Sequence, residues 1–191
     1  MDYVPGSEWC LPDGRQLDIP TAMSVEEATE LARLSTGRVV LEIGAWYGFS
    51  TCVIASTAKE VVSVDPHRVD EWDGRTPWVW SFETWRANVD KYAECPVTAV
   101  VGRSPGVLAY LSNVFDMAFI DGDHSYDAVL ADGRECVALM QDRPFLYGIL
   151  AFHDYGRVEG VMEAVQQLIS EVGGTLRGRG VTGSLAVVDG V

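Results

Sequence analysis

A short turn that contains two glycines places the strongest constraint on how this chain can fold. The turn occupies residues 42–50, Glu-Ile-Gly-Ala-Trp-Tyr-Gly-Phe-Ser, and it follows an apolar run at residues 39–41. A helix-like segment, residues 51–58, comes directly after it. Glycines in such a turn let backbone N–H groups and the positive end of a helix approach a ligand closely. The order strand, turn, helix therefore predicts an α/β fold with a ligand site at this turn.

The spacing of the turn indicates which kind of ligand it suits. It reads Glu-x-Gly-x-x-x-Gly, whereas dinucleotide-binding turns read Gly-x-Gly-x-x-Gly. The carboxylate of Glu42 would repel a pyrophosphate but attract an ammonium group, such as the one on the methionine end of S-adenosylmethionine. Residues 60–65 are predicted as a second buried strand, and Asp65 at its end can accept hydrogen bonds from both hydroxyls of a ribose. The two motifs together predict a nucleoside-binding site.

The rest of the chain alternates predicted strands with predicted helices. Ser24 and Glu27 form a capping-box pattern before a first helix that Gly37 ends. Further strands are predicted at 97–101, 115–120 and 146–152, and helices near 81–93, 105–112, 125–141 and 157–172. The pattern predicts one doubly wound, mostly parallel sheet with helices on both faces, closed by an antiparallel hairpin of residues 175–179 and 183–188. We expect an N-terminal extension, residues 1–23, and a single domain, residues 24–191.

Composition excludes several classes of partner. The 191 residues include 14 basic and 28 acidic side chains, a net charge of −14, which disfavours nucleic acid and anionic membrane surfaces as partners. No apolar run reaches the roughly 20 residues that span a bilayer, and the N-terminus has no secretory signal pattern, so a cytoplasmic location is expected. The four cysteines lack Cys-x-x-Cys spacing, and Cys52 and Cys136 are expected to be small core residues.

A second group of polar residues follows the fourth and fifth predicted strands. Asp121 ends one strand, His124 comes three residues later, and His153 and Asp154 end the other. The carboxyl ends of parallel strands meet at one edge of the sheet, so Asp121, His153 and Asp154 could hold Mg²⁺ or Mn²⁺. A neutral His124 could then accept a hydroxyl proton. The alternative is structural, in which Asp123 only caps a helix and His153 is a hydrogen-bonded core histidine.

Three tryptophans, Trp72, Trp78 and Trp80, lie in the segment between the second and third strands. Aromatic side chains in a loop above the ligand edge could form a wall or lid for a ring-shaped substrate. Together with the predicted base, they indicate a small-molecule substrate that carries a hydroxyl group and has a ring, either a sugar or an aromatic ring.

The motifs that carry a family resemblance are residues 42–50, 64–66, 119–126 and 152–155. Together they resemble the class I S-adenosylmethionine-dependent methyltransferases, and among these the small-molecule O-methyltransferases of the sugar, macrolide and catechol types. The resemblance covers roughly residues 25–190. It implies a Rossmann-like sheet of seven strands with the last one antiparallel, a metal at Asp121, His153 and Asp154, and His124 as base. The His-Asp pair departs from relatives that carry two acids, or an acid and an amide, at this place.

The resemblance also implies where the cofactor lies. Gly44 and Gly48 would lie under its methionine part, Asp65 at the ribose, and residues 102–104 near the adenine. The predicted cofactor-binding set is Glu42, Gly44, Tyr47, Gly48, Ser50, Asp65, Pro66, His67, Arg103, Ser104 and Asp121.

Three other functions compete with methyl transfer. The first is a non-catalytic protein of the same fold that only binds a nucleoside or S-adenosylmethionine. The second is a nicotinamide oxidoreductase, which the glycine spacing disfavours. The third is a metal-dependent phosphohydrolase, which would need more histidines than the three in the chain. Relatives of the methyltransferase kind also often assemble, so a homo-oligomer is a further expectation.

Overall fold

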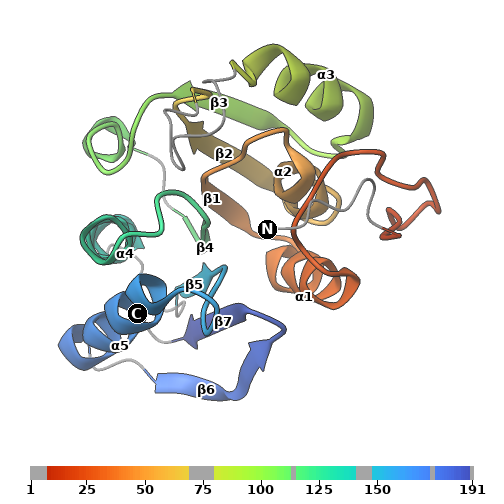
Figure 1. The fold of residues 1–191 in the computed structure, drawn as a ribbon. Helices are drawn as coiled ribbons and strands as arrows, with labels where there is room; N and C mark the ends of the chain where they lie inside the picture. Colours follow the sequence, from red (N-terminus) through yellow and green to blue (C-terminus); the bar gives the residue numbers. More distant parts are fainter. Residues whose placement is uncertain (1–7, 69–79, 113–114, 141–147, 173–174, 190–191) are drawn as a thin grey trace.

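One seven-stranded sheet forms the centre of the protein (Figure 1). The computed structural model describes residues 8–68, 80–112, 115–140, 148–172 and 175–189. Its strands are β1 (Val39–Ile43), β2 (Glu60–Asp65), β3 (Val97–Val101), β4 (Met117–Ile120), β5 (Ile149–Phe152), β6 (Thr175–Thr182) and β7 (Leu185–Asp189). They follow the order β3-β2-β1-β4-β5-β7-β6. Neighbours among β1 to β5 pair in parallel, and β7 is antiparallel to β5 and β6, which confirms the predicted sheet and its reversed last strand.

Helices cover both faces of the sheet, as predicted. On one face pack α1 (Val25–Ser35), α2 (Phe49–Ala55) and α3 (Phe82–Tyr92), and on the other α4 (Tyr126–Met140) and α5 (Glu159–Val172) (Figure 1). Alternate residues of each strand point to opposite faces. Val40 and Phe119 accordingly lie in the core under α1 to α3, whereas Leu41 and Ile120 lie in the core under α4 and α5.

Local sequence correctly predicted the capping box of α1 and the two buried cysteines, but it wrongly predicted one helix. The predicted capping box at α1 is present: Ser24 accepts from the backbone of Glu27, whose side chain accepts in return. The buried, free Cys52 and Cys136 are also as predicted. The helix predicted at residues 105–112 is wrong, because the structure has only the short 3₁₀ turn η1 (Leu108–Tyr110) there. Gly106 lies near its start, and glycine disfavours a continuous helix.

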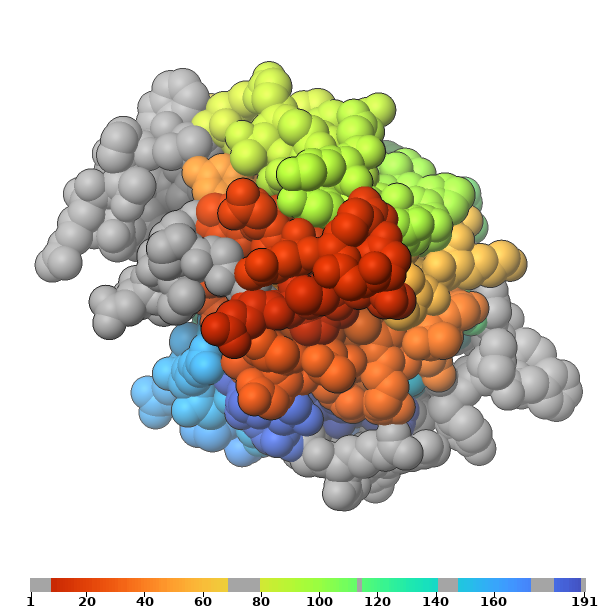
Figure 2. Space-filling model, turned by 90° about the vertical axis from the view of Figure 1, so that its right-hand side faces the viewer, coloured from red at the N-terminus to blue at the C-terminus, as the bar shows by residue number. Residues whose placement is uncertain are grey.

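The described part of the predicted N-terminal extension is packed into the domain. Trp9, Leu11, Leu17 and Ile19 are buried in the same core as α1 and α2. Figure 2 shows this segment lying across the face between α3 and α1. Among the described residues, no helix is long and apolar enough to cross a membrane.

Candidate functional site at the carboxyl edge of the sheet

The strand order reverses between β1 and β4, and ligands of such sheets bind at the carboxyl edge near this point. The backbone is strained at the same edge. Among the described residues, the non-glycine residues with positive φ are Trp46 (45°), His67 (50°) and Asp154 (58°), and each follows the end of a strand. Such conformations cost free energy and collect at functional sites, so the edge is the place to search.

The glycine turn is fixed against the loop that follows β4. Gly44 has a φ of +88°, and a Cβ there would lie 2.5 Å from the carbonyl carbon of Asp121 and 2.8 Å from the nitrogen of Gly122. Its N–H donates to the carbonyl of Val64 (2.9 Å). Gly48 (φ +91°) precedes α2. Only a glycine allows this contact, so the turn cannot move toward Asp121 without displacing the backbone of Asp121.

Asp65 fastens the turn from the end of β2. Its Oδ2 accepts hydrogen bonds from the backbone N–H groups of Ala45 (2.6 Å) and Trp46 (2.9 Å). Its Oδ1 accepts one from the N–H of His67 (2.5 Å). The side chain keeps 13% of its surface exposed. A ribose contact by Asp65 stays a prediction, and the structure adds a role in holding the turn.

Glu42 is fully buried beneath the turn. Its carboxylate accepts hydrogen bonds from the hydroxyls of Ser50, Thr51 and Ser63, each at 2.6 Å. Burial raises the pKa of Glu42 to about 7, although the three hydroxyls oppose the shift. In this structure its contacts are internal, and an ammonium group as its partner stays a prediction.

Replacing Glu42 by glutamine should flatten the pH dependence of stability. The pKa of Glu42 is raised from 4.5 to about 7 in the folded protein. The carboxyl group therefore stabilises the fold fully below pH 4.5, and this stabilisation is lost as the pH rises through 7. The contribution of Glu42 to the unfolding free energy should fall by about 3 kcal/mol across this window, at about 1.36 kcal/mol per pKa unit. Denaturant unfolding of both proteins at pH 5 to 8 measures it, and parallel profiles would contradict the assignment.

The other predicted cofactor residues have mixed surroundings. His67, after Pro66, is buried, and its Nδ1 lies 3.1 Å from the hydroxyl of Ser81, so the structure gives its ring a packing role. Tyr47 stacks on the half-exposed Trp46 with ring centroids 4.4 Å apart. Contacts to a cofactor by these residues stay predictions.

The loop after β3, which holds Arg103 and Ser104, is tied to α4. The hydroxyl of Ser104 donates to Oδ2 of Asp132 (2.9 Å), which is buried. Burial raises the pKa of Asp132 to about 6, with Ser104 opposing the shift. Sequence analysis missed Asp132, because an acid on the inner face of a helix has no distinguishing pattern.

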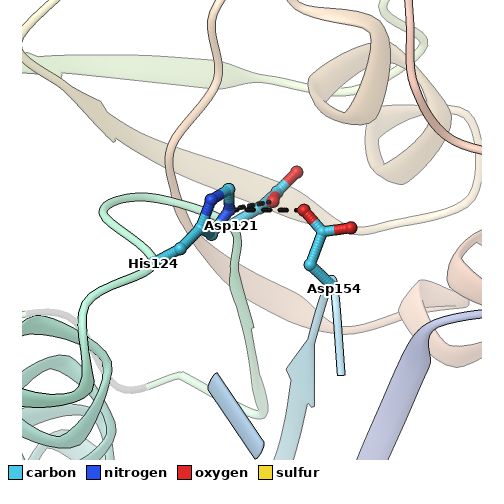
Figure 3. Close-up of side chains that lie close together, drawn as sticks. All are labelled: Asp121, His124 and Asp154. Atoms are coloured by element: carbon cyan, nitrogen blue, oxygen red, sulfur yellow. Dashed lines mark hydrogen bonds and ion pairs between the residues drawn. The ribbon is translucent and has the colours of Figure 1, made fainter. Parts of the chain in front are cut away.

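Asp121, His124 and Asp154 converge at the centre of the edge (Figure 3). Nε2 of His124 lies 3.4 Å from Oδ1 of Asp121 and 3.5 Å from Oδ2 of Asp154. One ligand atom from each of the three residues lies within 4.8 Å of the others, close enough to hold a cation. The hydrogen bond to Asp121 raises the pKa of His124, although burial opposes this.

His153 lies beside the same two acids. Its Nδ1 is 3.3 Å from Oδ1 of Asp121 and 3.6 Å from Oδ1 of Asp154. Burial would lower the pKa of His153, but the surrounding carboxylates raise it to about 12. Burial would likewise raise the pKa of Asp121, yet His153 and His124 lower it to about 2. The structure thus brings all four predicted residues together: both histidines lie near Oδ1 of Asp121, and each lies near a different oxygen of Asp154.

The aromatic wall can be followed only in part. Trp80 precedes α3 and is 43% exposed, with its ring centroid 6.1 Å from that of Phe82. Trp72 and Trp78 lie outside the described residues. An aromatic wall over the site stays a prediction.

The match to a known family decides the class of protein. Residues 41–155 match the family described as "Methyltransferase domain", and they hold the glycine turn, Asp65 and the acid–histidine cluster. The chain belongs to this methyltransferase family. The segment is more than half of the chain, and the predicted methyltransferase class is confirmed. A comparison with curated proteins found no match.

Solved structures share the fold of this methyltransferase at low sequence identity. Cofactor-bound Rv0187 from MTB has a TM-score of 0.63 and 23% identity over 87% of this chain and 80% of its own. The O-methyltransferase from Bacillus cereus, in complex with SAH, has a TM-score of 0.60 and 17% identity over 87% and 81%. TomG from Streptomyces achromogenes, an O-methyltransferase of tomaymycin synthesis in complex with SAM, has 0.59 and 17% over 94% and 83%.

Proposed function

We propose that this methyltransferase binds S-adenosylmethionine and transfers its methyl group to a hydroxyl group of a small molecule. The observation that carries the proposal is the contact between the two parts of the site, where the backbone of Gly44 packs on that of Asp121. A cofactor on the turn would lie beside groups able to take a hydroxyl proton. The Bacillus cereus and Streptomyces achromogenes proteins, which hold SAH and SAM, support this choice of cofactor.

In the proposed reaction, the acceptor oxygen bonds to the methyl carbon while the bond from that carbon to sulfur breaks. The products are the methyl ether and S-adenosylhomocysteine. The hydroxyl proton passes to Nε2 of His124, whose pKa the hydrogen bond to Asp121 raises. The protein otherwise contributes by aligning the two substrates and excluding water.

A divalent cation, Mg²⁺ or Mn²⁺, is the second part of the proposal. Asp121, His153 and Asp154 would hold it, and when bound it would lower the pKa of the acceptor hydroxyl. The residues fit such an ion, because the buried Oδ1 of Asp154 has no hydrogen bond within the described part of the chain. Nδ1 of His153 lies 3.3 Å from Oδ1 of Asp121 and 3.6 Å from Oδ1 of Asp154, so it could supply the imidazole ligand in place of His124. With His153 as the ligand, Nε2 of His124 would act as the base.

Titration calorimetry of S-adenosylmethionine and S-adenosylhomocysteine tests the proposal first. We expect micromolar binding, and Asp65→Ala should weaken it about 10- to 100-fold, because charge-assisted hydrogen bonds contribute about 1.5–3 kcal/mol. Asp90→Ala, which removes an exposed acid paired with Arg86, is the matched control. An unchanged cofactor affinity in Asp65→Ala would contradict the ribose assignment. No binding by the wild type would contradict S-adenosylmethionine as the cofactor.

A screen of hydroxyl acceptors separates the enzyme from a binding protein of the same fold. Methylation of any sugar or phenol hydroxyl would exclude the non-catalytic alternative. The same assay with chelator, and then with added Mg²⁺ or Mn²⁺, tests the cation. Turnover that is insensitive to chelator would leave His124 as base and remove the metal from the proposal.

A further inference from the structure

A buried acid outside the predicted site faces the back of His153. Glu27 of α1 is fully buried. Its Oε1 accepts hydrogen bonds from the N–H (2.6 Å) and the hydroxyl (2.8 Å) of Ser184. Its Oε2 accepts one from the N–H of Ser24 (2.7 Å) and lies 3.6 Å from Nε2 of His153. Helix α1, the turn before β7 and the end of β5 therefore meet at this carboxylate.

The turn between β6 and β7 is shaped to admit the carboxylate. Gly183 has a φ of +62°, and a Cβ there would lie 2.5 Å from Oε1 and 2.8 Å from Cδ of Glu27. The loop after β5 is held by the same turn, because the N–H of Tyr155 donates to the carbonyl of Ser184 (2.9 Å). A side chain at position 183 would push the acid away from its partners.

The position of Glu27 decides which nitrogen of His153 faces the site. Nε2 of His153 has no hydrogen bond within the described residues, and its ion-pair partner is Glu27. A proton on Nε2 is attracted to the carboxylate, whereas a lone pair there would be repelled by it. Nδ1 is then the atom that faces Asp121 and Asp154. A carboxylate behind a histidine commonly fixes the ring and its tautomer in this way.

We propose that Glu27 is a positioning residue, which holds His153 with its Nε2–H toward α1 and its Nδ1 toward the two acids of the site. The expected effect on turnover rests on the proposed function, whereas the proposed geometry of Glu27 and His153 does not depend on it. It makes the N-terminal helix and the C-terminal hairpin part of the support of the site.

Nitrogen-15 spectra of the three histidine rings, with and without Glu27→Gln, test the geometry directly. His67→Gln and His124→Gln variants assign the signals. We expect Nε2 of His153 to carry a proton in the wild type and its signal to shift in Glu27→Gln, because the neutral amide no longer attracts that proton as the carboxylate does. The same Nε2 signal in both proteins would overturn the proposal.

Function and binding give a second readout. Glu27→Gln should lower kcat, and Mn²⁺ affinity if the cation binds, by about 10- to 100-fold, with cofactor affinity unchanged. Leu31→Ala, a buried change on the same helix, is the control for loss of stability alone and should leave the Nε2 signal in place. If Glu27→Gln does not fold, Gly183→Ala carries the test, since it retains the acid but displaces it. A wild type without methyl transfer would refute the proposed function, and the spectra would still decide the role of Glu27.

Discussion

Replacing His124 by alanine is expected to lower kcat about 100- to 10,000-fold, the range for loss of a positioned acid–base group. Nε2 of His124 lies between Asp121 and Asp154 at the carboxyl edge, and the ring keeps enough exposure for an acceptor to reach it. The glycine turn and Asp65 do not depend on this side chain. Calorimetry should therefore find cofactor affinity nearly unchanged while initial rates collapse.

The pH profile of the wild type adds a check on the same assignment. The hydrogen bond to Asp121 raises the pKa of His124, so the neutral ring that can accept a proton forms at a higher pH than in an ordinary histidine. The rate should increase with pH through this raised pKa, and the increase should vanish in His124→Gln. Ser125→Ala, the exposed neighbour, is the matched control. A variant that lacks His124 but turns over at the wild-type rate would refute the base assignment.

The sheet and its polar edge could be predicted because both depend on local sequence. Apolar runs set the strands: β2 and β3 begin and end where the sequence indicated. The capping box at Ser24 fixed the start of α1. Polar residues directly after the runs had to meet at the carboxyl edge, because parallel strands all end on the same side.

What could not be predicted depends on contacts between distant residues. Glu27 looks like the last member of a capping box, a position that is ordinarily solvated. Its second role comes from Ser184, 157 residues away in the sequence. The sequence places Glu42 at the glycine turn, but only the packed turn reveals that the hydroxyls of Ser50, Thr51 and Ser63 surround its carboxylate. Local pattern identifies which residues reach the edge, and tertiary packing decides which way they point.

Gly44→Ala is expected to disable binding and catalysis together. An L residue at a φ of +88° is strained by about 1–3 kcal/mol, and the new methyl group would press on the backbone of Asp121 and Gly122, for about 1–3 kcal/mol more. The unfolding free energy should therefore fall by about 2–6 kcal/mol. Because relief of the overlap has to move the turn or the loop after β4, cofactor affinity and kcat should both drop more than tenfold.

Gly37→Ala separates the two causes. Gly37 also has a positive φ, +70°, but a Cβ there would meet nothing within 4 Å. It should lose about 1–2 kcal/mol of stability through backbone strain alone and keep full cofactor affinity. Denaturant unfolding and titration of both variants compare the positions. If Gly44→Ala lost no more than Gly37→Ala in either measurement, the glycine turn and Asp121 would not be coupled through their backbones, and the two parts of the site would have to be treated as independent.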